Sequence, residues 1–157
     1  MDRDRILRDH LRRLLDWEDA HAGFDRAVDG IDPSKHGVIP ATGHSVWQLL
    51  EHLRRTQFDI LDFCRNPDYE EPPMSEYWPS GAAPPSGSAW QESVASFERD
   101  REDLKTLAMD PSIDLFARIP HGSGQTYLRE LVLVADHNAY HIGQIIAARR
   151  ALGIWNE

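Results

Sequence analysis

The sequence predicts an all-α protein, a four-helix bundle in which residues 1–157 form a single domain. Apolar residues recur with helical periodicity in four long segments, and no convincing period-2 strand pattern is found. Stretches rich in Gly and Pro separate these segments. A chain of 157 residues with 41% hydrophobic residues can bury one core, and amphipathic helices joined by loops are typical of a bundle.

The first helix is predicted over residues 3–28. Acidic and basic side chains four residues apart, such as Asp4 and Arg8, indicate an exposed, solvated face. The loop of residues 29–43 that follows is rich in Gly and Pro. The apolar face of this helix is formed by Ile6, Leu7, Leu11, Leu14 and Leu15.

The second helix is predicted to begin near Ser45 and to end before Pro67. Ser45 and Gln48 have the spacing of a capping box, in which each side chain bonds the other residue's backbone N–H. Cys64, the only cysteine, lies on the apolar stripe, so we predict a core residue, and an internal disulfide is excluded. The stripe consists of Val46, Leu49, Leu50, Leu53, Ile60, Leu61 and Cys64.

A long Pro-rich loop, Asn66 to Ser88, separates the second helix from the third. Structureless loops of this length are uncommon in compact domains and are often functional. Tyr77 and Trp78 within it are predicted either to cover an apolar opening or to pin the loop to the bundle.

The third helix is predicted from Ser88, where Ser88 and Gln91 again have capping-box spacing, to Asp110. The last helix is predicted over residues 125–151, with Gly153 as its C-cap. It is apolar nearly all round, which indicates burial on more than one side and leads us to expect a homodimer.

Charge and composition limit the classes of binding partner and the cellular compartment that the sequence predicts. The net charge is −9, and the densest basic run, residues 3–13, is interleaved with aspartates, so we expect no nucleic-acid partner. No apolar run approaches the roughly 20 residues that span a bilayer, so we expect no membrane partner. The N-terminus shows no apolar region of a secretion signal, and one cysteine suits a reducing compartment, so a cytoplasmic location is expected.

Two histidines lie four residues apart in the last helix, in the run VADHNAYHIGQII. His137 and His141 therefore share one helix face. Two stacked buried imidazoles repel if both are charged and satisfy each other poorly if both are neutral, and a divalent metal ion resolves this conflict. A facing helix could supply a third ligand, for which His52 is the candidate; the alternative is a boundary histidine with its tip in water.

The other polar residues near these positions are assigned supporting or solvated roles. Gln144 follows His141 by one turn and Gln48 precedes His52 by one turn, so each is predicted to support a ligand histidine. Of the remaining histidines, His44 is predicted to be a capping or pocket residue. His121 is predicted to lie in a loop that approaches the same end of the bundle as the candidate ligands. His10, His21 and His36 are predicted to be solvated.

Three segments in order resemble the DinB-like (YfiT-related) proteins. They are SVWQLLEHLRRTQFDIL, EYWP and PHGSGQTYLRELVLVADHNAYHIGQIIAARRALGIW, and the similarity covers nearly the whole chain. The resemblance implies a four-helix bundle with up-down-down-up topology, compatible with the long loops after the first and second helices, and often a homodimer. It also implies one divalent metal ion per chain, held at the positions of His52, His137 and His141.

Three nitrogen ligands leave a position open on the ion, which is typical of catalytic sites. Some DinB-like proteins look like transferases that use bacillithiol or mycothiol. We therefore predict a metal-dependent enzyme that transfers or activates a low-molecular-weight thiol with a small-molecule substrate. The sequence identifies no catalytic side chain; water or the thiol is expected to bind at the open position on the ion. Zinc is the expected ion, with nickel, iron or manganese as alternatives.

Two other functions remain open from the sequence. A metal-dependent hydrolase would need a general base, and the carboxylates next to the ligands, Glu51 and Asp136, point off the ligand face by about 100°. A non-catalytic metal- or ligand-binding dimeric module is favoured if Gln144 or His44 closes the coordination sphere.

Overall fold

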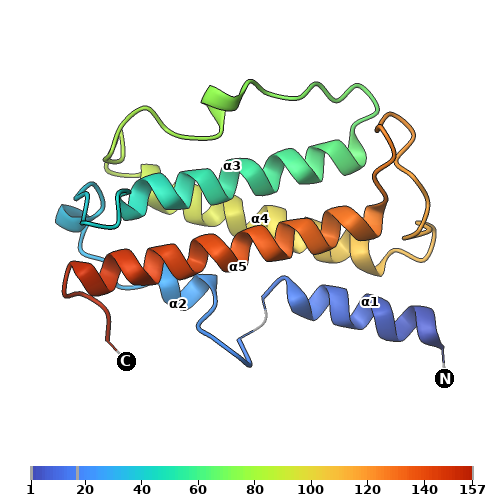
Figure 1. Cartoon of the computed structure of the whole chain (residues 1–157), viewed down its shortest axis with the longest axis horizontal. Helices are drawn as coiled ribbons and strands as arrows, with labels where there is room; N and C mark the ends of the chain where they lie inside the picture. The colour runs from blue at the N-terminus through green and yellow to red at the C-terminus, as the bar shows by residue number, and fades with distance from the viewer. Residues whose placement is uncertain (1, 17, 157) are drawn as a thin grey trace.

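The computed structural model describes residues 2–16 and 18–156, and its regular elements over these residues are all helical (Figure 1). They are α1 (Arg3–Leu14), α2 (Phe24–Val28), α3 (Val46–Arg65), α4 (Ala89–Met109) and α5 (Tyr127–Ala151), with two short 3-10 turns, η1 (Pro33–Lys35) and η2 (Met74–Glu76). None of the helices in the described ranges has the length and apolarity that crossing a membrane requires.

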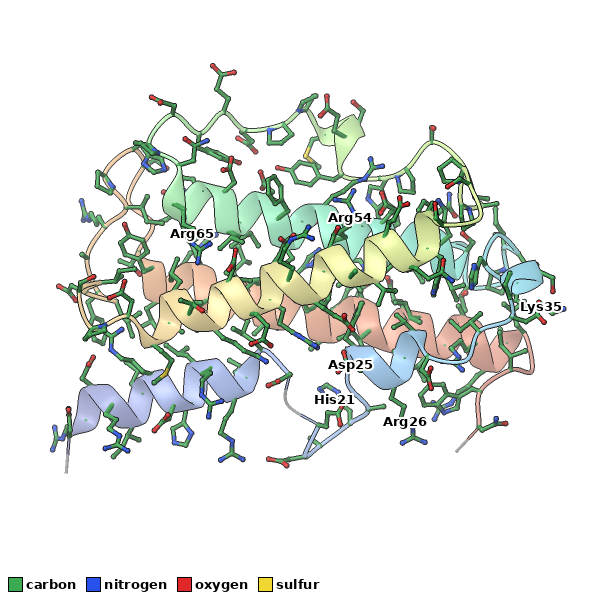
Figure 2. The ribbon with its side chains drawn as sticks, turned by 180° about the vertical axis from the view of Figure 1, so that it is seen from behind. His21, Asp25, Arg26, Lys35, Arg54 and Arg65 are labelled. Atoms are coloured by element: carbon green, nitrogen blue, oxygen red, sulfur yellow. The ribbon has the colours of Figure 1, made fainter. Side chains whose placement is uncertain are left out.

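The long loop between α3 and α4 decides the topology. It returns along the length of α3, so that α3 and α4 run in the same direction while α1 and α5 run in the opposite one (Figure 1). The predicted four-helix bundle with up-down-down-up order is therefore confirmed. Figure 2 shows Arg54 and Arg65 on the side of α3 that faces α4, where Arg65 donates a hydrogen bond to Asp103 over 2.9 Å.

The predicted first helix over residues 3–28 is wrong in its extent, because α1 ends at Leu14 and α2 begins only at Phe24. In a continuous helix, Phe24 would lie roughly 140° around the axis from Leu11 at about 100° per residue. Both side chains are buried, Leu11 at one end of the core and Phe24 at the other. The break between α1 and α2 therefore lets two different faces of the segment reach the core.

Arg8 corrects the prediction that the basic residues of α1 are solvated. Its guanidinium is buried and donates hydrogen bonds to the carbonyls of Ala108 (2.9 Å), Asp110 (2.9 Å) and Ile113 (2.7 Å). It also keeps the predicted pair with Asp4, at 2.7 Å. The last carbonyls of a helix have no partner within the helix, and a cation is favourable there, so Arg8 fastens α1 to the C-terminal end of α4.

The helix caps agree with the sequence in part. Ser45 and Gln48 form the predicted capping box, with both side chain to backbone distances at 3.1 Å. Ser88 makes no side-chain cap bond, so the second predicted box, with Gln91, is wrong. The backbone of Ser88 is already helical (φ −93°, ψ −16°), whereas a capping residue needs an extended conformation.

The core consists of two apolar clusters with a polar pair between them. One cluster contains Leu50, Leu53 and Phe97, and the other contains Leu61, Cys64, Leu104 and Leu131. Between them, Asn138 Nδ2 donates to Gln57 Oε1 (2.9 Å), and Gln57 Nε2 donates to the Phe97 carbonyl (2.8 Å). This chain of hydrogen bonds ties α5, α3 and α4 together at the level of the histidines of α5.

Candidate metal centre

The structure brings the three predicted ligands together. His52 comes from α3, and His137 and His141 come from successive turns of α5. The Nε2 atom of His52 lies 3.1 Å from the Nε2 of His141 and 3.1 Å from the Nε2 of His137. One ligand atom from each histidine lies within 4.8 Å of the other two, and no cysteine or carboxylate belongs to the cluster among the residues that the structure describes.

Hydrogen bonds on the outer nitrogens fix which ring nitrogens carry protons. His52 Nδ1 lies 3.0 Å from the Tyr77 carbonyl, and His141 Nδ1 lies 2.7 Å from Gln144 Oε1. These oxygens only accept, so both protons sit on Nδ1 when the rings are neutral. The Nε2 atoms of His52 and His141 therefore face each other as lone pairs, which repel unless a cation lies between them.

The spacing of these nitrogens fits a small divalent ion. Two nitrogens that each lie about 2.05 Å from a tetrahedral ion are about 3.3 Å apart, close to the 3.1 Å observed. His137 has a buried Nδ1 without a hydrogen-bond partner among the described residues, as has Asn138 Oδ1. The three imidazoles could thus hold one metal ion through nitrogen atoms already directed at a common point.

Burial keeps the three imidazoles in the form that binds metals. Burial, together with the neighbouring His141 and His52, lowers the pKa of His137 to about 4. Burial also lowers the pKa of His52 and the pKa of His141. All three are therefore neutral at pH 7, and a neutral imidazole offers the lone pair that a metal ion needs.

The two predicted glutamine supports have different outcomes. Gln144 Oε1 accepts a hydrogen bond from His141 Nδ1, and Gln144 Nε2 donates to the Tyr140 hydroxyl at 3.1 Å. The side chain of Gln48 instead takes part in the capping box of α3. The partner of His52 is the Tyr77 carbonyl, which sequence reasoning missed because a backbone oxygen leaves no mark in the sequence.

Of the two alternatives for the aromatic pair of the long loop, the contacts support the one in which the pair pins the loop to the bundle. The indole of Trp78 stacks on the His52 ring, with centroids 4.0 Å apart and an interplanar angle of 6°. The same indole stacks on His44 at 4.4 Å. Tyr77 and Trp78 therefore pin the loop to α3 and at the same time cover His52. His44 belongs to this aromatic cover and not to the histidine cluster.

The remaining histidines lie away from the cluster. His36 corrects the prediction of a solvated residue, because the residue is 4% exposed and its ring stacks on Trp90 at 3.8 Å. The loop before α3 folds over the first turn of α4 and buries this ring. His121 is exposed and contacts the Phe63 carbonyl at 2.8 Å, near the C-terminal end of α3. His10 and His21 are exposed, as predicted.

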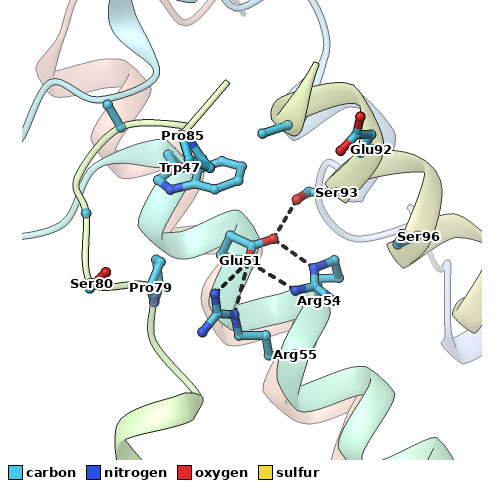
Figure 3. A pocket seen from close by; sticks show the side chains of 13 residues that line it. Trp47, Glu51, Arg54, Arg55, Pro79, Ser80, Pro85, Glu92, Ser93 and Ser96 are labelled. Carbon is cyan, nitrogen blue, oxygen red and sulfur yellow. Dashed lines mark hydrogen bonds and ion pairs between the residues drawn. The ribbon is translucent and has the colours of Figure 1, made fainter. Parts of the chain in front are cut away.

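The carboxylate of Glu51 is next to a ligand in sequence but is not a free base. It is 4% exposed and is bound by Arg54, Arg55 and Ser93 (Figure 3). Although burial raises the pKa of Glu51, the hydrogen bonds from Arg54 and Ser93 prevail and lower it to about 2. Asp136 is exposed on α5. Glu51 therefore does not offer the raised pKa that general-base catalysis near pH 7 requires.

The Cys64 thiol is expected to resist modification in the folded protein. Burial raises its pKa to about 12, so at pH 8 it remains protonated, and the thiolate is the reactive form. Ellman's reagent at pH 8 should react roughly 100-fold more slowly with folded protein than with protein unfolded in guanidinium, which serves as the control. Equal rates in the two samples would contradict this result.

Comparison with known proteins identifies the family. A family model described as the DinB superfamily matches residues 16–145, which is most of the chain and includes all three histidines of the cluster. No curated protein and no solved structure gave a significant match. The all-helical bundle and the histidine cluster agree with the family match, and the chain belongs to the DinB superfamily.

Proposed function

We propose that the protein is a metal-dependent enzyme that activates the sulfur of a low-molecular-weight thiol for transfer to a small electrophile. In this proposal His52, His137 and His141 hold one divalent ion, zinc in the first place. The observation that carries the proposal is the 3.1 Å approach of the unprotonated Nε2 atoms of His52 and His141.

The donor set supports a site with an open position. Structural zinc sites are closed by four protein ligands, whereas catalytic sites keep one position free. Gln144 directs its oxygen at the Nδ1 of His141, and His44 stacks on Trp78, so neither is a member of the cluster. This favours the enzyme over the non-catalytic binding module.

A thiol is the cosubstrate that suits this chain best. A divalent ion lowers the pKa of a thiol that coordinates it. The only cysteine of the chain, Cys64, is buried in the apolar core, so the sulfur must come from a small molecule. The hydrolase alternative has less support, because Glu51 is held as a carboxylate by two arginines and a serine.

The transfer itself needs no further cofactor. The thiol releases its proton to solvent, its sulfur forms a bond to an electrophilic carbon, and the leaving group departs with the electron pair of the bond that breaks. The neutral imidazoles provide three nitrogen ligands without adding negative charge near the sulfur. Gln144 and the Tyr77 carbonyl keep two of these imidazoles oriented.

The experiment that tests the proposal combines metal content with a transfer assay. Untagged protein is expected to contain one equivalent of zinc or another divalent ion by elemental mass spectrometry, and His137→Ala is expected to lose it. With bacillithiol or mycothiol and a chloronitrobenzene electrophile, the same variant should lose activity by about two orders of magnitude or more.

Cys64→Ala is the matched control for the assay and should keep both the metal and the activity. Activity that needs no added thiol, or that survives loss of the metal in His137→Ala, would overturn the proposal.

The homodimer stays a prediction. The exposed apolar side chains of α5 that a second chain could cover include Val132 and Tyr140, which are 46% and 64% exposed.

A further inference from the structure

Residues 76–78 of the long loop, here called the strap, present three successive carbonyl oxygens to side chains of α3. Arg55 Nη1 donates to the Glu76 carbonyl at 2.8 Å and to the Trp78 carbonyl at 3.3 Å. The carbonyl between them, that of Tyr77, accepts from His52 Nδ1 at 3.0 Å. Arg55 thus holds the strap on both sides of the carbonyl that contacts a candidate metal ligand.

The Arg55 guanidinium that binds the strap is held in place by the Glu51 carboxylate. Arg55 Nε donates to Glu51 Oε2 at 3.0 Å, and the same carboxylate accepts hydrogen bonds from Arg54 and from Ser93 of α4 (Figure 3). Arg54 is bound to Glu51 in a similar way but lies on the side of α3 that faces α4 (Figure 2). Of the two neighbouring arginines, Arg55 is the one that reaches the strap carbonyls.

A second anchor lies one helical turn further along α3. The Tyr77 hydroxyl donates to Asp59 Oδ2 at 2.9 Å, and the Tyr69 hydroxyl donates to Asp59 Oδ1 at 2.8 Å. His52, Arg55 and Asp59 are spaced i, i+3 and i+7, so they lie along one face of the helix. The strap is therefore attached to α3 at three points on a single face.

We propose that Arg55 and Tyr77 are positioning residues that set the tautomer and ring orientation of His52 through the strap. With its proton held on Nδ1 by the Tyr77 carbonyl, His52 must present the Nε2 lone pair to the histidine cluster. Stacking of Trp78 at 4.0 Å restricts rotation of the same ring. The consequence for metal affinity rests on the proposed function, whereas the tautomer of His52 does not.

The decisive test compares Arg55→Met with Arg54→Met, because both variants remove one arginine from Glu51 and only the first releases the strap. Zinc dissociation constants are measured by competition with a chelator. Arg55→Met should weaken zinc binding by roughly 10–100-fold, while Arg54→Met should change it by no more than about threefold. An equal effect of the two variants, or no effect of Arg55→Met, would overturn the proposal.

A second readout needs no metal. Long-range ¹H–¹⁵N spectra of the imidazoles, recorded on metal-free protein at pH 8, report which nitrogen of His52 carries the proton. Wild type and Arg54→Met should show the proton on Nδ1, and Arg55→Met should show a mixture of tautomers. If wild-type protein binds no zinc, the proposed function fails, but these spectra still decide whether the strap orients His52.

The two tyrosines that share Asp59 provide a second matched pair. Tyr77→Phe removes the hydrogen bond that anchors the strap, and Tyr69→Phe removes the other hydrogen bond to the same carboxylate. Only Tyr77→Phe should change the His52 spectrum and weaken zinc binding. Thermal unfolding of the metal-free proteins checks that both variants fold, and a changed spectrum in Tyr69→Phe alone would contradict the assignment.

Discussion

Alanine in place of His141 is expected to abolish the stabilisation of the protein by zinc. A ligand that binds only the folded state at 100 times its dissociation constant adds about 2.7 kcal/mol to the free energy of unfolding. Wild type should show a gain of this order in urea unfolding with zinc, and His141→Ala should show almost none. The variant leaves two histidines in the cluster and removes the hydrogen bond between His141 and Gln144 Oε1.

The metal-free proteins provide the physical check. Because the Nε2 lone pairs of His52 and His141 face each other at 3.1 Å, removing one imidazole also removes a repulsion. His141→Ala without zinc should therefore lose no more than about 1 kcal/mol of stability. His10→Ala, which removes an exposed histidine of α1, is the control and should keep the full effect of zinc. Equal stabilisation by zinc in all three proteins would contradict the proposed ligand set.

Replacement of Arg8 by methionine is expected to cause a large loss of stability. The guanidinium donates to three backbone carbonyls at and beyond the end of α4, and methionine keeps the apolar stem but offers no donor. Hydrogen bonds to charged groups and buried polar atoms left without partners are each worth a few kcal/mol, so the free energy of unfolding should fall by roughly 2–4 kcal/mol.

The control for this variant is Arg12→Met, which makes the same change at an exposed position of the same helix. Its stability should lie within about 0.5 kcal/mol of wild type. Urea denaturation of the metal-free proteins measures both differences. If the two variants lose equal amounts of stability, the hydrogen bonds of Arg8 to the end of α4 are not the cause of the loss.

Prediction from the sequence succeeded where the relevant pattern is local. The spacing of apolar residues placed the last three long helices to within about two residues at their ends, as boundaries usually are. The four-residue spacing of His137 and His141 placed both rings on one face of α5, since successive turns of a helix stack. The position of His52 on the second helix made it a candidate for the third metal ligand, and the family resemblance implied the same residue.

Prediction failed where the outcome depends on contacts with segments that are distant in the sequence. Arg8 was assigned to a solvated face because its acceptors, the carbonyls of residues 108, 110 and 113, lie about one hundred residues away. The break between α1 and α2 depends on which side chains reach the core, since Leu11 and Phe24 are buried in different apolar clusters. Burial of His36 depends on how the preceding loop crosses α4, where its ring meets Trp90.

The sequence by itself determined the three long helices α3, α4 and α5, the shared helix face of His137 and His141, and the resemblance to the family. The tertiary structure alone decided that the long loop returns along α3, that its Tyr77 carbonyl orients His52, and that Arg8 closes the end of α4. The physical reason is that the order of residue types shows which side chains share a helix face. Every residue has the same backbone carbonyl, so the sequence does not show which carbonyl will accept a given hydrogen bond. Which carbonyl meets which side chain is settled only when distant segments pack together.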